Sequence, residues 1–409
     1  MISTTRVGAL GAAMLLTAAA GCSAKAEGDA VPGVTEDTIT LGALIDLSGP
    51  FSGSGKMTVK GIEMAMDDIN AAGGVCGRDL ELEVRDTGYD VQRAVVAYGE
   101  IEDDILGMRA VYGSAVVSAV LDRIHDSDML MAPTSFAGQL LGDPNLVVFG
   151  PTFGTMVING LDFLKSKGDI KPNDKIGHLY LEGELGEDSL AGSTFYADRH
   201  DMEVVGIQVK ATDTDLRGQV QQLADAGVTA IVAETTPSQV ASVAAVSESV
   251  GLRVPIISGP QGFGNSLLDT NVGPVLEHRF YKMSGVAPMG ADTPEMTEFR
   301  ERYQANNGEP ESGTGVVDAY VTTNVYVQMI TEACDNLTRE GLLKARTKLA
   351  DFQQPGMTPV EDFSDISAPS SAESVVLGVN RDAYSGLEVV QDFTASPTAR
   401  EYVAQSGQD

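Results

Sequence analysis

The sequence predicts an α/β protein of two lobes, each with a parallel central sheet. Three observations support this fold class. The chain has 409 residues, which is enough for two domains after an apolar leader is set aside. Strand and helix patterns alternate in two successive series, as expected for parallel strands joined by helical crossovers. The 45 glycines, few aromatic residues and absence of tryptophan suit closely packed α/β layers.

The first strand and helix flank the most informative loop. Alternate residues from Ile39 to Ile45 are apolar, which predicts a strand over 39–46. Apolar residues from Val59 to Ile69 recur at spacings of three and four, which predicts a helix over 56–72. The loop between them carries hydroxyl groups and glycines, which let a small polar ligand approach the backbone closely.

The same patterns predict the remaining elements. In the first series they predict strands over 80–86, 109–113 and 129–133, and helices over 91–103 and 115–125. In the second they predict strands over 175–181, 203–209, 230–234 and 254–258, and helices over 216–226 and 238–250. Helices over 294–305, 313–332 and 337–349 follow, then a polar run over 353–372 and two strands within 373–393.

The N-terminus predicts export and lipid anchoring. An apolar run from Val7 to Ala20 is too short for a permanent membrane helix. Small residues precede Cys22, as in a lipobox, so cleavage would leave a lipidated Cys22 at the mature N-terminus. We therefore expect a signal peptide over 1–21, a tether over 22–37 and an extracytoplasmic protein anchored to the cell membrane. An ordinary signal peptide followed by an accidental cysteine is the alternative.

The composition argues against several other functions. A net charge of −31 opposes nucleic-acid binding, which needs a basic surface. The segment from Ser52 to Met57 imitates a phosphate loop, but it lacks the required spacing and the hydroxyl residue after lysine. The four histidines are scattered, and no nucleophile elbow or dinucleotide fingerprint follows a strand. We expect no catalytic residue, no metal and no cofactor.

Two cysteines remain after Cys22. Cys76 follows the first helix, and Cys334 lies near the end of a long predicted helix. An exported protein allows a disulfide between them, and two free thiols are the alternative. Metal binding would need more ligands nearby.

One N-terminal motif carries a family resemblance. The run Leu47-Ser48-Gly49-Pro50, Gly61 and the ending Asp68–Gly74 resemble the start of the leucine/isoleucine/valine-type substrate-binding proteins of ABC importers. The resemblance extends over about 38–393. It implies two Rossmann-like lobes joined by a three-segment hinge, with lobe I over 38–151 and 284–352, lobe II over 152–283 and 353–395, and a tail over 396–409. It also implies a monomer that closes on a small solute and docks on an ABC permease with its ATPase.

Ligands in open α/β sheets bind beyond the carboxyl ends of the strands. In the first lobe this rule selects Ser48, Phe51, Ser54, Gly113, Ser114, Thr134, Ser135 and Phe136. The resemblance implies that Ser114 and either Thr134 or Ser135 hold a ligand carboxylate. A helix cap alone is the alternative role for Ser114, and Ser118 is the alternative ligand contact.

In the second lobe the same rule selects Glu182, Leu185, Glu234, Thr235 and Gln261. Leu185 and Thr235 stand where branched-chain receptors carry tyrosines, and Ser54 stands where an aromatic residue is usual. Gln261 replaces a glutamate that pairs with the ligand ammonium, a role that Glu234 or Glu182 could take. A branched-chain amino acid, another carboxylate and an amide-like metabolite all remain open as ligands.

These observations predict an extracytoplasmic receptor that delivers a small solute to an ABC importer. A ligand sensor of the same fold, coupled to a signalling partner, is the alternative. An exported enzyme is a third hypothesis, but the sequence offers no set of nucleophile and base for it.

Overall fold

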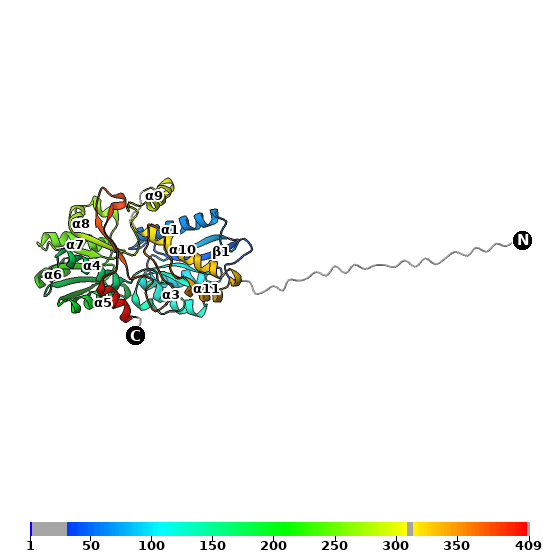
Figure 1. Cartoon of the computed structure of the whole chain (residues 1–409), viewed down its shortest axis with the longest axis horizontal. Coiled ribbons are helices and arrows are strands. Elements are labelled where there is room, and N and C mark those ends of the chain that lie inside the picture. Colours follow the sequence, from blue (N-terminus) through cyan, green and yellow to red (C-terminus); the bar gives the residue numbers. More distant parts are fainter. Residues whose placement is uncertain (2–30, 309–313, 407–409) are drawn as a thin grey trace. The chain divides into compact units, whose positions relative to one another are not determined.

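The computed structural model describes Met1, residues 31–308 and residues 314–406 (Figure 1). From Val31 onward, two separate sheets form the centres of two α/β lobes. The predicted fold class is therefore confirmed. The predicted signal peptide, Cys22 and residues 22–30 of the predicted tether lie outside the described residues.

Lobe I is built on a four-stranded parallel sheet with the strand order β2-β1-β3-β4. Its strands are β1 (Thr38–Ile45), β2 (Asp79–Asp86), β3 (Gly107–Tyr112) and β4 (Met131–Thr134). The crossover elements are α1 (Ser52–Ala71), α2 (Val91–Ile101), α3 (Ser114–Asp126) and the 3₁₀ turn η1 (Gly138–Leu140). Because all four strands are parallel, their carboxyl ends lie at one edge of the sheet.

Lobe II is built on a seven-stranded sheet with the order β11-β10-β9-β8-β7-β5-β6. Its strands are β5 (Lys175–Leu181), β6 (Glu203–Val209), β7 (Ala230–Glu234), β8 (Ile256–Ser258), β9 (Phe280–Ser284), β10 (Ser374–Val379) and β11 (Leu387–Thr394). Only the pairs of β10 with β9 and β11 are antiparallel among the strand pairs of this sheet. The helices are α4 (Phe153–Lys167), α5 (Glu184–Arg199), α6 (Arg217–Ala226), α7 (Pro237–Ser249), α8 (Gly273–Arg279) and the turn η2 (Asn265–Asp269).

The chain passes between the two lobes three times. After β9 it forms α9 (Pro294–Asn307), α10 (Gly315–Glu332), η3 (Cys334–Asn336), α11 (Arg339–Ala345) and η4 (Arg346–Lys348). Helix α10 packs along α1 (Figure 1). Gly61 of α1 permits this approach, since a Cβ atom there would lie 2.3 Å from the Val316 carbonyl oxygen. The chain then returns through residues 349–373 to β10.

Some elements differ from those predicted. Helix α1 begins at Ser52, four residues before the predicted start at 56, so the hydroxyl-rich segment forms its first turn. Helix α4 was not predicted, because it is buried on nearly every face and lacks the polar side of an amphipathic helix. The predicted helix over 337–349 is divided between α11 and η4. The predicted tail over 396–409 contains a helix, α12 (Pro397–Ser406), which packs against α4 and α5.

Cys76 and Cys334 are joined in a disulfide. The bond links the loop between α1 and β2 to η3, at the end of α10, so it ties together two helices that already pack on each other. Within the described ranges, no helix combines the length and the apolar character needed to span a membrane.

Candidate ligand-binding cleft between the lobes

A small cleft, partly open to solvent, is lined by residues of both lobes. From lobe I, the cleft-lining residues are Ser54, Thr58, Tyr112, Thr134 and Phe136, together with Thr314, Gly315 and Asp318 at the start of α10. From lobe II, they are Pro260, Gln261, Ser284, Gly285 and Val286. The β-strand ends of both sheets therefore meet at one site.

Four of the predicted ligand residues line this cleft: Ser54, Thr134, Phe136 and Gln261. Ser54 lies in the first turn of α1, and Thr134 is the last residue of β4. The Phe136 ring packs edge-on against Phe153, with 5.5 Å between ring centroids. The strand-end rule found these positions because it depends on topology alone.

Three predicted residues of lobe I contact residues 86–89 instead of lining the cleft: Ser48, Phe51 and Gly113. The Ser48 hydroxyl donates to the Asp86 carboxylate at 2.8 Å. Phe51 is buried and packs on Tyr89, with 4.9 Å between ring centroids. Tyr89 also covers Gly113, where a Cβ atom would lie 2.2 Å from the tyrosine ring. None of these three predicted residues lines the cleft.

Ser114 and Ser135 bond to each other rather than facing the cleft. Their hydroxyl oxygens are 2.7 Å apart, and both residues are buried. Ser118, one turn further along α3, donates to the carboxylate of Glu184 at the start of α5. This last bond connects the two lobes directly.

The other predicted residues of lobe II also lie outside the cleft lining. Glu182 is exposed, and Leu185 packs partly buried against the core. Glu234 is buried and accepts a hydrogen bond from the Gly259 amide at 2.6 Å. Burial raises the pKa of Glu234 to about 7. Thr235 is buried, and its hydroxyl has no hydrogen-bond partner among the described residues.

Gln261 presents an unused acceptor at the cleft. Its side-chain oxygen Oε1 is buried and has no hydrogen-bond partner within the described part of the chain. Buried polar atoms are almost always paired, so an unpaired one at a cleft points to a ligand or a water molecule. The side chain of Ser54, which belongs to the opposite lobe, forms a hydrogen bond with the Tyr112 hydroxyl. The cleft wall thus combines aromatic surface with hydroxyl and amide groups.

Three charged residues near the cleft floor escaped the sequence analysis: Arg109 of β3, Lys282 of β9 and Asp318 of α10. Arg109 is buried and donates to Thr323 Oγ1 and to the Ala319 carbonyl oxygen, each at 2.7 Å. Burial raises the pKa of Asp318 to about 6, although Arg109 and Lys282 oppose that shift. The sequence offered a signal only for Arg109, a charged residue at the start of the predicted strand 109–113; Asp318 lies in a predicted helix, and the strand that holds Lys282 was not predicted.

A small, largely apolar pocket adjoins the cleft. The two spaces share Thr134, Phe136 and Asp318. Apolar side chains from β4, the following segment and α10 form most of its remaining wall: Ala132, Pro133, Val147, Phe149 and Val325. These apolar side chains are the surface nearest the cleft that could contact an aliphatic tail, and Arg109, Thr322 and Tyr326 complete the lining of the pocket.

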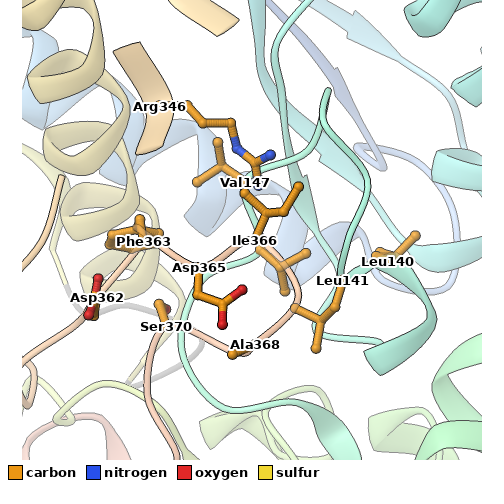
Figure 2. A pocket seen from close by; sticks show the side chains of 11 residues that line it. Leu140, Leu141, Val147, Arg346, Asp362, Phe363, Asp365, Ile366, Ala368 and Ser370 are labelled. Carbon is orange, nitrogen blue, oxygen red and sulfur yellow. The ribbon is translucent and has the colours of Figure 1, made fainter. Parts of the chain in front are cut away.

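Another pocket, of about 300 Å³, lies near the third connection between the lobes (Figure 2). Val147, Leu141 and Ile366 contribute its apolar wall, and Asp365 lies beside them. Arg346 donates to the carbonyl oxygens of Asp143 and Pro144, so its charge is already engaged. None of the predicted ligand residues lines this pocket, and the interlobe cleft is the stronger candidate. Among the residues that the structure covers, no group of three or more histidine, cysteine or acidic side chains could hold a metal ion.

Comparison with known proteins agrees with this geometry. A family model described as periplasmic binding protein matches residues 38–373. The leucine-, isoleucine-, valine-, threonine-, and alanine-binding protein of Pseudomonas aeruginosa is 26% identical over 308 residues, covering 73% of this chain and 79% of that protein. These relatives are binding proteins of transporters, not enzymes, and the family implies an extracytoplasmic location.

Solved structures give the same result. The fatty acid ABC transporter substrate-binding protein from Thermomonospora curvata is 34% identical, with a TM-score of 0.88, and the match covers 92% of this chain and 97% of that chain. A branched chain amino acid ABC transporter protein from Thermus thermophilus with bound valine shares the fold, with a TM-score of 0.78, 17% identity and coverage of 90% and 99%. The chain therefore belongs to the periplasmic binding protein family, type 1, the family of the leucine/isoleucine/valine-binding proteins.

Proposed function

We propose that this protein is the extracytoplasmic receptor of an ABC importer and that it binds an aliphatic carboxylic acid between its lobes. One observation carries the proposal: a polar cleft lined by both lobes opens beside an apolar pocket, and the two share Thr134 and Phe136. Ligand sites of this kind are mostly apolar with a few placed polar groups. Closure of the lobes on the ligand would present the form that the permease recognises.

The names of the relatives favour a ligand with a carboxylate group, but they differ in the class of that ligand. The name of the Pseudomonas aeruginosa relative specifies small amino acids, and that of the Thermomonospora curvata relative specifies a fatty acid. The second is more similar to this chain and covers more of it. In addition, Gln261 offers an amide where the resembled receptors have a glutamate for the ligand ammonium. We therefore favour an acid without an amino group.

The remaining parts of the proposal concern the setting. We infer that Cys22 carries the lipid anchor and that the receptor acts as a monomer beside its permease and ATPase. Replacement of Cys22 by alanine should move the protein from the membrane fraction to the soluble fraction of the producing cells. Continued membrane association of Cys22→Ala would contradict lipid anchoring.

A ligand screen tests the proposed function. The chain from Ser23 onward is mixed with acids of increasing length, from acetate to decanoate, and with leucine, valine and threonine, and its thermal unfolding is followed. A ligand that binds the folded state raises the melting temperature. We expect a shift that grows with acid length until the apolar pocket is filled. Shifts with the amino acids alone would identify an amino-acid receptor, and no shift with any of these solutes would contradict both readings.

A further inference from the structure

Lys282 of β9 is buried behind Thr314, a residue of the cleft wall, and has few partners. The solvent-exposed fraction of Lys282 is 0%. Its ammonium group donates to the Thr314 hydroxyl at 2.8 Å. An ammonium group has three N–H donors, and no other acceptor for Lys282 occurs among the residues described. No carboxylate of the described chain forms an ion pair with it either.

Such a lysine is costly to bury. Moving an ammonium group out of water is strongly unfavourable unless hydrogen bonds and an opposite charge compensate. Burial lowers the pKa of Lys282 to about 7, and only the attraction of Asp318 opposes this shift. A charged Lys282 therefore lacks both the hydrogen-bond acceptors and the ion-pair partner that would compensate its burial.

Lys282 is connected to the cleft through its hydrogen-bond partner and through its neighbour on β9. Ser284, two residues later on β9, lines the cleft, and so does Thr314, the single partner of Lys282. Tyr281, the preceding residue, faces the other side of the strand, where its hydroxyl accepts a hydrogen bond from Lys167 of α4. An anion beside Thr314 would thus lie one hydroxyl group away from the ammonium.

The charges around the cleft floor favour an anion over a cation. Arg109 and Lys282 are the nearby cations, and Asp318 is the acid that both of them attract. The larger of those two attractions on Asp318 comes from Arg109. Burial raises the pKa of Glu361, which also interacts with Asp318, to about 8, so this carboxyl group is largely neutral at pH 7. One positive charge, that of Lys282, is left without a counter-ion.

We infer that Lys282 is the counter-ion for the ligand carboxylate and determines the preference of this receptor for acids over neutral ligands of the same shape. Lys282 belongs to lobe II and Thr314 to lobe I, so a carboxylate held by both also joins the two lobes. The inference rests on the proposed function, since it assigns the head-group contact of that same site.

The test compares a matched pair of probes, octanoate and octanamide, which differ only in the charge of the head group. Their affinities are measured by isothermal titration at pH 7 for the wild type, for Lys282→Met and for the control Lys167→Met, which alters a lysine on the opposite side of β9. We expect the wild type and Lys167→Met to prefer octanoate at least tenfold. In Lys282→Met the octanoate affinity should fall at least tenfold, with the octanamide affinity changed less than threefold.

Proton uptake gives a second readout that a purely structural role would not produce. A bound carboxylate should restore the proton that burial removes from part of the Lys282 population. Titration in two buffers of different ionisation enthalpy should therefore show proton uptake by the wild type, and less uptake by Lys282→Met. Because Asp318, Arg109 and Glu361 remain in both proteins, the difference reports Lys282 together with its effect on the pKa of Asp318. Lys282→Gln serves the same comparison if the methionine variant does not fold.

The outcomes separate the inference from the function on which it rests. A wild type that binds neither octanoate nor the other acids overturns the proposed function. A wild type that binds both probes equally, or a Lys282→Met variant that retains the tenfold preference, overturns the role of Lys282 and leaves the receptor function intact. Equal loss of both probes in Lys282→Met would show a structural role and would also overturn the inference.

Discussion

The family resemblance implied that Ser114 and either Thr134 or Ser135 contact a ligand carboxylate, yet the structure gives Ser114 and Thr134 different surroundings. Thr134 lines both the cleft and the apolar pocket. The Ser114 hydroxyl is buried against the Ser135 hydroxyl at 2.7 Å. A hydroxyl that contacts ligand and a hydroxyl that pairs within the protein should respond differently to removal.

We predict that Thr134→Ala weakens octanoate binding about 2- to 10-fold, the range for loss of one hydrogen bond. Ser114→Ala should instead lower the free energy of unfolding by about 1 kcal/mol, because Ser135 loses its buried partner, with little effect on affinity. Titration calorimetry and urea unfolding of both variants test this pair of expectations. The interpretation fails if Ser114→Ala weakens binding more than Thr134→Ala.

For single residues, the sequence predicted a place near the cleft where the order of strands and helices determines it. It did not predict that place where the direction of the side chain determines it. Ser54, Thr134, Phe136 and Gln261 follow strands or open a helix, so their place near the cleft could be predicted. Lys282 and Asp318 lie within a strand and a helix. Which way such side chains face depends on packing between lobes, which the periodicity of one element does not specify.

At the scale of elements, β5 and α5 are joined through a buried histidine. His178 is buried, and its Nδ1 lies 2.8 Å from the Ser193 hydroxyl oxygen. Burial lowers the pKa of His178 to about 3, whereas an unfolded histidine has a pKa of about 6.5. Between these values the unfolded chain binds a proton that the folded chain does not. The contribution of His178 to stability is therefore complete above pH 6.5 and is lost as the pH falls toward 3.

We predict that the wild type loses about 2 kcal/mol more unfolding free energy between pH 7.5 and pH 5 than does His178→Asn. Urea unfolding at both pH values measures this difference, and other titrating groups cancel in the comparison. His278→Asn, at an exposed histidine, is the matched control and should follow the wild type. Parallel pH profiles for the wild type and His178→Asn would contradict the assignment.

The disulfide acts on two elements of lobe I. The bond between Cys76 and Cys334 closes a loop of 258 residues. We predict that the double variant Cys76→Ser/Cys334→Ser is less stable by about 2–4 kcal/mol, since the unfolded chain gains freedom. Reductant should lower the melting temperature of the wild type to that of the variant and should not affect the variant. Two free thiols in the purified oxidised protein, detected by mass spectrometry, would refute the bond.

Helix prediction depended on amphipathicity, and this explains why α4 was missed; α5, α8 and strand β9 were missed as well. Helices α1 and α10 were predicted, with small errors at their N-termini. Helix α4 was not, because its buried faces leave no polar stripe. Its packing partners, among them α12 and α5, come from distant parts of the sequence.

For the whole molecule, the alternating series predicted two α/β lobes, but only the family resemblance implied that the chain returns to lobe I and then to lobe II. The lobes also meet between α3 and α5, where Ser118 donates to Glu184. This contact exists only when the lobes approach, so it should favour the ligand-bound form.

We predict that Ser118→Ala increases the ligand dissociation rate about 2- to 5-fold, as expected for the loss of one modest hydrogen bond. The association rate should change little, because the open form is unaffected. Stopped-flow or surface plasmon resonance measurements separate the two rates. Ser249→Ala, at an exposed serine on α7, is the control. A slower association with unchanged dissociation would contradict a role in closure.

A crystal structure of the protein with octanoate tests the central claim most directly. Our account predicts the carboxylate beside Thr314, near Lys282, with the aliphatic chain passing Thr134 and Phe136 toward the apolar pocket. Octanoate bound elsewhere, or crystals that accept only leucine with its ammonium group on Asp318, would contradict a receptor built for aliphatic acids.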